Sequence, residues 1–175
     1  TNTLLYFIPF GLLTIVYIVP FLGGFQKNLR KVSYLKIFIV AGVWSGVTST
    51  IPLLVGEYQI ENDILLLFIQ RMFFILVLIL PFEIRDMHLD FKHIKTLPQK
   101  IGVEKTKKVG FVLLLFSLTM EFLLTASFTS KNIFLGICSV LLFLLMRSSQ
   151  NQTKFYSSFW VESLPIVWWV LLLIF

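Results

Sequence analysis

Six long apolar stretches, separated by short polar segments, make up most of this chain. A membrane-spanning helix needs about 20 mainly apolar residues. Most of the stretches reach that length, although the fifth is short and prolines interrupt the first. The strands of a membrane barrel would alternate polar and apolar residues over about 10 positions, and these stretches do not. The pattern therefore predicts an all-α, polytopic transmembrane helical bundle with spans at 3–22, 36–55, 62–82, 109–128, 132–147 and 155–175.

Composition supports a membrane protein and excludes several kinds of site. Apolar residues make up 57% of the 175 residues and charged residues only 14%, which leaves more apolar surface than a soluble domain can bury. The single cysteine, Cys138, has no partner for an internal disulfide, so we expect plain packing there. The only histidines, His88 and His93, share one polar loop, and no zinc site is expected. We expect the lipid bilayer, and no nucleic acid, as the surroundings of this chain.

The basic residues predict the orientation of the spans. All but two of the 15 Lys and Arg residues lie in the loops 23–36, 83–108 and 147–154; the exceptions are Arg71 and Lys131. Cytoplasmic loops carry an excess of Lys and Arg. We therefore expect these three loops to be cytoplasmic in an integral protein of a bacterial inner membrane. The chain also opens at the edge of a span, without an initiator Met, and we expect it to be a fragment of a longer protein.

Two carboxylates stand out in the polar segment after the third stretch. Asp86 and Asp90 are four residues apart, a spacing that places both on one face of a helix. At the edge of a span, such a pair can hold a hard divalent cation together with the phosphates of a substrate. The alternative is a solvated helix end in a cytoplasmic loop.

The residues around this pair carry a family resemblance. Residues 83–102 read EIRDMHLDFKHIKTLPQKIG. This segment resembles the second aspartate-rich motif of the UbiA superfamily of intramembrane prenyltransferases, in which RDxxxD is followed by a Lys/Arg-Thr-Leu/Ala-Pro stretch that closes on a glycine. Ile94 stands where the family often has Gly. The matching positions are Asp86, Asp90, Lys95, Thr96, Leu97, Pro98 and Gly102.

The resemblance implies a fold and a place in it for this chain. Members of the superfamily have nine helices, with the second aspartate-rich loop between the sixth and the seventh. Residues 1–175 would then form a single transmembrane domain that holds the C-terminal six helices, with 83–108 as its polar cytoplasmic loop and three helices missing at the N-terminus. The first motif of the family, NxxxDxxxD, is absent from these residues. We therefore expect this part alone to be inactive.

The resemblance also implies an activity, the Mg²⁺-dependent transfer of a prenyl chain from a polyprenyl diphosphate to an acceptor, often an aromatic one. Asp86 and Asp90 would be the catalytic residues and the metal ligands. A basic pair after the family's fourth helix corresponds best to Arg30 and Lys31, which with Lys95 would bind the diphosphate. The identity of the acceptor and the length of the prenyl chain are not specified by this sequence.

Other interpretations remain open at this stage. A CDP-alcohol phosphotransferase is not favoured, because the chain contains no Asp-Gly or Ala-Arg pair. A UbiA-like protein without catalysis, acting as a binding or partner subunit, and an unrelated small-molecule transporter are the alternatives. Arg71 and Glu121 are charges inside spans, which usually face a cavity or a partner. They could pair with each other, or Arg71 could contact the acceptor.

Overall fold

The computed structural model describes residues 3–18, 33–56, 61–88 and 96–175. Within these residues, all of the regular secondary structure is helical. In chain order the elements are α1 (Thr3–Ile18), α3 (Ser33–Ser45), the π-helix η1 (Gly46–Thr50), α4 (Ile51–Val55), α5 (Glu61–Arg85), the 3-10 helix η2 (Asp86–His88), α6 (Leu97–Ile101), α7 (Val103–Leu123), α8 (Phe128–Arg147), the π-helix η3 (Tyr156–Val161) and α9 (Leu164–Ile174).

Four helical segments are long and apolar enough to cross a membrane: Leu35–Val55, Asp63–Arg85, Phe128–Arg147 and Tyr156–Ile174. α7 is also long, but its first turns carry Glu104 and three lysines, and Glu121 follows near its other end. In α1, the apolar helix Leu4–Ile15 is shorter than a span. The predicted all-helical membrane fold is thus confirmed with four candidate spans. The count of six spans and the three missing helices stay predictions.

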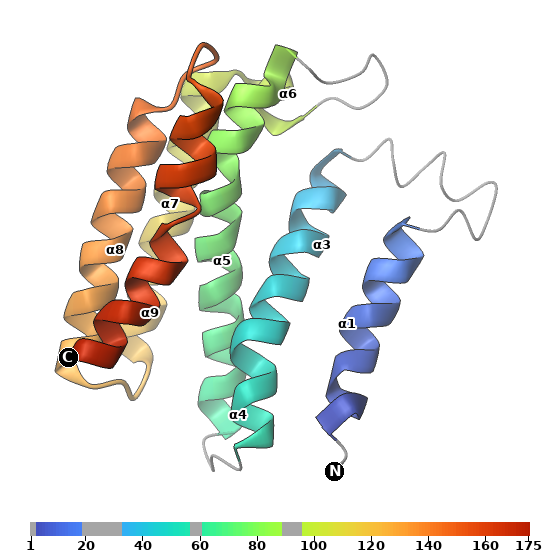
Figure 1. The fold of residues 1–175 in the computed structure, drawn as a ribbon, viewed down its shortest axis with the longest axis vertical. Coiled ribbons are helices and arrows are strands. Elements are labelled where there is room, and N and C mark those ends of the chain that lie inside the picture. Colours follow the sequence, from blue (N-terminus) through green and yellow to red (C-terminus); the bar gives the residue numbers. More distant parts are fainter. Residues whose placement is uncertain (1–2, 19–32, 57–60, 89–95) are drawn as a thin grey trace.

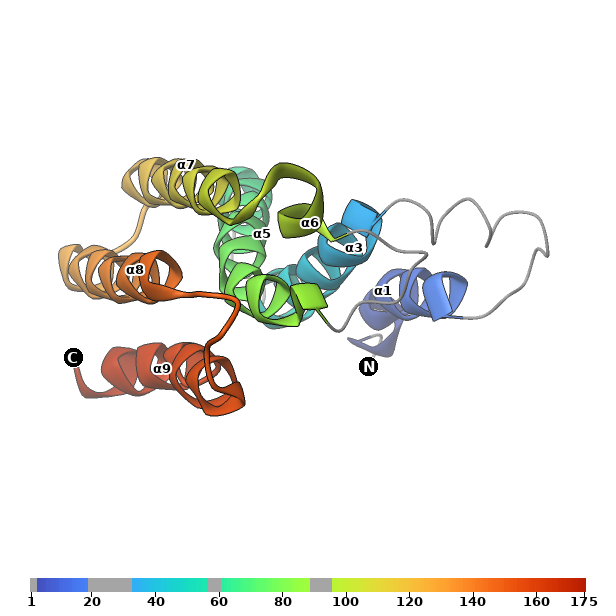
Figure 2. The same cartoon turned by 90° about the horizontal axis from the view of Figure 1, so that it is seen from above.

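α5 is the central helix of the bundle. It contacts α3 on one side and α7 and α8 on the other, while α8 also contacts α9 and α1 contacts α3. The helices stand side by side in Figure 1, and the view from above in Figure 2 shows α5 between α3 and the row of α7, α8 and α9. Neighbours on several sides explain why every residue from Phe74 to Leu78 is buried. A helix with a single packed face would bury only one stripe of residues.

The core lies where α5, α7, α8 and α9 meet. Phe74, Phe134 and Trp168 form an aromatic cluster with ring centroids 4.9 to 5.8 Å apart. Gly110 allows α7 to approach closely, because a Cβ there would lie 2.4 Å from Leu145 Cδ2 and 2.8 Å from Leu80 Cδ1. Large apolar side chains on the outer faces are exposed, as lipid-facing side chains would be; they include Phe111, Leu115, Phe122, Phe143 and Ile166.

Except for Arg71 within α5 and Lys131 in α8, the described basic residues gather at one end of the bundle. Figure 1 shows that α5 ends, α7 begins and α8 ends at the same end. Lys131, in the first turns of α8, lies at the opposite end. This arrangement agrees with the charge asymmetry from which the orientation was predicted. The described residues at the basic end, where α3 also begins, are Lys36, Arg85, Lys100, Lys105, Lys107, Lys108, Arg147 and Lys154.

Two exposed asparagines near opposite ends of α8 allow the orientation to be tested. Asn132 lies in the first turns of the helix, and Asn151 lies four residues after Arg147, the last residue of the helix. In a chain whose buried Cys138 is replaced by alanine, we expect a membrane-impermeant maleimide to label Asn132→Cys in intact cells. It should label Asn151→Cys only after the membrane has been permeabilised. The reverse pattern, or labelling of both from outside, would contradict the predicted orientation.

Candidate functional site

The candidate site begins at the end of α5, where the helix passes into η2. Asp86 is the first residue of η2, and its carboxylate accepts two hydrogen bonds from the neighbouring Arg85. Arg85 Nε lies 2.6 Å from Oδ1 and Arg85 Nη2 lies 3.0 Å from Oδ2. A guanidinium that binds both oxygens of a carboxylate fixes its position as well as its charge. The Asp86 side chain is therefore held in one orientation.

Arg85 also connects this end of α5 to η3. Its Nη1 donates to Ser157 Oγ at 2.6 Å and to Ser158 Oγ at 3.3 Å. Ser157 is fully buried, so one side of the guanidinium lies against the bundle. Arg85 thus acts as a structural link between α5 and the segment that leads into α9. The two serines gave no sign of this role in the sequence.

The Thr96-Leu97-Pro98 segment forms a helix start, as a capping residue followed closely by a proline indicates. Thr96 is the N-cap of α6, Pro98 lies in its first turn, and Gly102, with φ 84°, ends it. Gln99 Oε1 accepts from the Thr96 backbone N–H at 3.0 Å, as a glutamine at the third helical position does in a capping box. A positive φ favours glycine, which accounts for Gly102 at this turn into α7.

Gln99 has a second contact that joins α6 to η2. Its Nε2 donates to the Met87 backbone carbonyl at 2.6 Å. Asp86 and Thr96 are therefore held near each other by residues on both sides of the segment 89–95. The capping role of Gln99 was readable from its spacing to Thr96, whereas its bond to Met87 was not.

The other predicted site residues have no described position. Asp90, Lys95, Arg30 and Lys31 lie outside the described residues, so the predicted metal ligands and diphosphate contacts stay predictions. Within the ranges that the structure describes, no three His, Cys, Asp or Glu residues group closely enough to hold a metal ion.

Asp86 itself suits a hard divalent cation. Its side chain is 35% exposed, and each carboxylate oxygen has two lone pairs. Arg85 takes one position on each oxygen, which leaves further oxygen positions free. Carboxylate oxygens are the ligands that Mg²⁺ prefers in proteins.

The contact between Gln99 and Met87 can be separated experimentally from the helix cap. Gln99→Glu keeps an acceptor for the Thr96 N–H but removes the donor to Met87, while Gln99→Ala removes both. A net hydrogen bond contributes about 0.5–1.5 kcal/mol. We therefore expect amide exchange in η2 to accelerate about 2- to 10-fold in both variants, and exchange in α6 to accelerate only in Gln99→Ala. Unchanged exchange in η2 would show that Met87 is held by other contacts.

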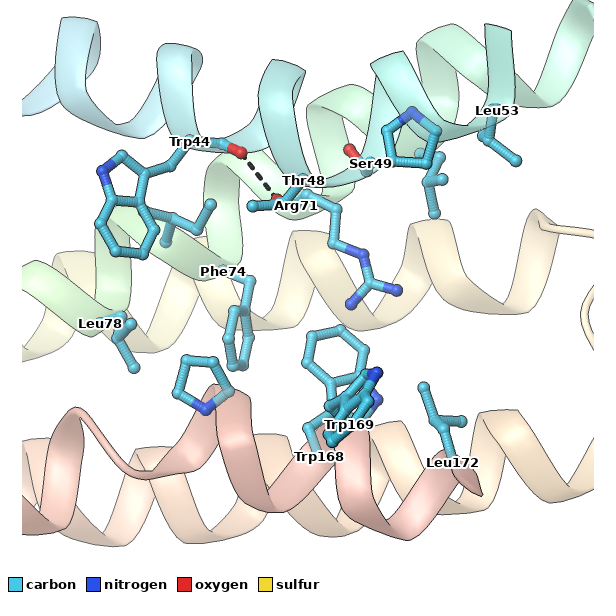
Figure 3. A pocket seen from close by; sticks show the side chains of 14 residues that line it. Trp44, Thr48, Ser49, Leu53, Arg71, Phe74, Leu78, Trp168, Trp169 and Leu172 are labelled. Carbon is cyan, nitrogen blue, oxygen red and sulfur yellow. Dashed lines mark hydrogen bonds between the residues drawn. The ribbon is translucent and has the colours of Figure 1, made fainter. Parts of the chain in front are cut away.

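A pocket of about 480 Å³ opens on a different face of α5, between the α3–α4 segment and α9. Figure 3 shows Arg71 reaching from α5 into the space between η1 and α9, toward Trp168 and Trp169. The lining is mainly apolar and aromatic: Trp44, Thr48, Ser49, Pro52, Leu53, Leu67, Arg71, Phe74, Ile75, Leu78, Pro165, Trp168, Trp169 and Leu172.

The two charges within the spans do not form an ion pair at contact distance. The Arg71 guanidinium carbon lies 3.6 Å from the centroid of the Trp168 ring and 5.8 Å from that of Phe134. Glu121, on α7, instead accepts a hydrogen bond of 2.6 Å from Gln70. Within the described part of the chain, the side chain of Arg71 has no hydrogen-bond or salt-bridge partner. Arg71 and Glu121 therefore interact only over a longer range.

Comparisons of this chain with protein-family models, with curated proteins and with solved structures found no match.

Proposed function

We propose that the full-length protein transfers a prenyl group from a polyprenyl diphosphate to an acceptor within the membrane. The observation that carries the proposal is the arrangement at the end of α5. Asp86 is oriented by Arg85, and the contact between Gln99 and Met87 holds it beside the start of α6. A fixed carboxylate at the end of an apolar helix suits a substrate with a phosphate head and an apolar tail.

Asp86 and Asp90 would hold Mg²⁺ at this site. When bound, the ion neutralises the charge of the diphosphate and so makes it a better leaving group. The residues of the chain supply the rest. Arg30, Lys31 and Lys95 would neutralise diphosphate oxygens, and apolar helix faces rich in Phe and Leu would bind the tail and exclude water. Exclusion of water matters because the allylic cation left by loss of diphosphate would otherwise react with water instead of the acceptor.

A second candidate is a UbiA-like protein without catalysis that acts as a binding or partner subunit. The specific observation in its favour is that both Asp86 oxygens already accept from Arg85. A purely structural ion pair would look the same. The two candidates differ in whether Asp86 is needed for chemistry or only for anchoring Arg85.

The deciding experiment uses membranes that contain the full-length protein, a panel of labelled polyprenyl diphosphates and a panel of aromatic and lipid acceptors. We expect a prenylated product that forms with Mg²⁺ and disappears with EDTA. If no donor and acceptor pair gives product while the protein is folded in the membrane, the candidate without catalysis replaces this proposal.

A further inference from the structure

We propose that the pocket around Arg71 is a binding site for an apolar monocarboxylate, that is, a molecule with a fatty or aromatic body and a single carboxylate. The lining of this pocket includes neither Asp86 nor any residue of α6, so it is distinct from the described part of the transfer site. The proposal therefore does not depend on prenyl transfer.

The charge of Arg71 is the first argument. Arg71 is the eleventh of the 25 residues of α5, which at 1.5 Å per residue puts it about 15 Å from one end and about 21 Å from the other. A cation at such depth is costly and usually faces a partner or a cavity. Its described contacts are the aromatic faces of Trp168 and Phe134, which stabilise a cation but provide no counter-charge.

The polar atoms of the pocket wall are the second argument. The hydroxyls of Thr48 and Ser49, in η1, donate to the backbone carbonyls of Trp44 and Ser45, four residues earlier at the end of α3. The other polar side-chain groups of the lining are the Arg71 guanidinium and the indole N–H groups, all of which can only donate. A ligand that fits this wall needs hydrogen-bond acceptors. An anion satisfies both the donors and the positive charge.

The depth of Arg71 in the membrane and the volume of the pocket indicate which class of anion would bind. The head group of a phospholipid lies at the membrane surface, whereas Arg71 lies about 15–21 Å from the helix ends. A single carboxylate matches the single charge of Arg71 and the planar fork of the guanidinium. The volume of about 480 Å³ falls within the about 300–1,000 Å³ that small-molecule sites occupy. The aromatic and aliphatic walls would cover the apolar body.

Glu121 should lower the affinity of this pocket for a negatively charged ligand. It contacts Gln70 rather than Arg71, but a carboxylate at this position would still interact with the guanidinium over a longer range. A negative ligand would therefore be repelled weakly by Glu121. Glu121→Gln keeps an acceptor for Gln70 and removes the charge, so it should tighten carboxylate binding without affecting a neutral ligand.

The pocket contains its own reporters, because Trp44, Trp168 and Trp169 line it. Trp160 does not line it and is 55% exposed, so Trp160→Phe would remove the background signal of the fourth tryptophan in residues 1–175. Bromine quenches indole fluorescence at short range. We would titrate the full-length protein in lipid nanodiscs with 11-bromoundecanoic acid, 6-bromo-2-naphthoic acid and, as the neutral control, 11-bromoundecanol.

We expect saturable quenching by at least one acid and only linear, partition-driven quenching by the alcohol. Arg71→Met should weaken acid binding about tenfold or more, since it removes a charged hydrogen-bond donor, and Arg71→Lys should weaken it less. The stronger of the two acids shows whether the site prefers a chain or a ring. Equal curves for acid and alcohol, or an unchanged curve in a folded Arg71→Met protein, would overturn the proposal.

Discussion

Replacement of Asp86 by alanine should lower Mg²⁺-dependent prenyl transfer by the full-length protein about 100- to 1,000-fold, the usual cost of losing one electrostatic contact to a transition state. Without this carboxylate, the charge of the diphosphate would be left uncompensated in a site of low dielectric constant. The measurement is product formation from a labelled polyprenyl diphosphate in membranes that contain equal amounts of each protein.

Asp86→Asn separates the metal role from the structural one. An amide oxygen still accepts from Arg85, so an anchoring role predicts that the asparagine variant keeps most of the activity. A metal-binding role predicts that it is nearly as impaired as the alanine variant. Glu104→Gln is the matched control, because Glu104 is an acid at the same end of the bundle whose side chain is 82% exposed. Near wild-type transfer by both Asp86 variants would refute the metal assignment.

Replacement of Gln70 by leucine should cost the bundle about 1–3 kcal/mol of stability. Gln70 is fully buried and donates to Glu121, which is 6% exposed. Removing one partner leaves a buried carboxyl group without its hydrogen bond, and this penalty exceeds the net value of the bond itself. Unfolding by SDS in mixed micelles, followed by circular dichroism, measures the change.

The double variant Gln70→Leu with Glu121→Leu tests that explanation. It removes both polar groups from the interface between α5 and α7, so much of the lost stability should return. Thr119→Val on α7 is the control, because the Thr119 hydroxyl is exposed and bonds only to Phe116 of its own helix. The single variant Glu121→Leu is measured as well. If the loss of stability in the double variant equalled the sum of the losses in the two single variants, the contact between Gln70 and Glu121 would not explain the loss in Gln70→Leu.

Several features of the protein could be predicted from the sequence because they are local. Apolar stretches of sufficient length predict helices in lipid, since no other open structure satisfies the backbone there. The helix start at Thr96 follows from a cap, a proline and a closing glycine within seven residues. The charge asymmetry is likewise a property of the chain that does not depend on packing. From this asymmetry alone, the basic loops were expected at one end of the bundle.

The contacts that build the candidate site and the pocket were decided only by tertiary structure. Gln70 and Glu121 are 51 residues apart, and Arg85 and Ser157 are 72 residues apart. Whether such residues meet depends on how each helix is rotated about its axis and which neighbours it packs against. Periodicity shows which residues share a face of one helix, but not which face of another helix it meets. For this reason Arg71 and Glu121, the two obvious partners within the spans, face different neighbours. Glu121 packs against Gln70, and Arg71 projects into a pocket lined by three tryptophans from two separate helices.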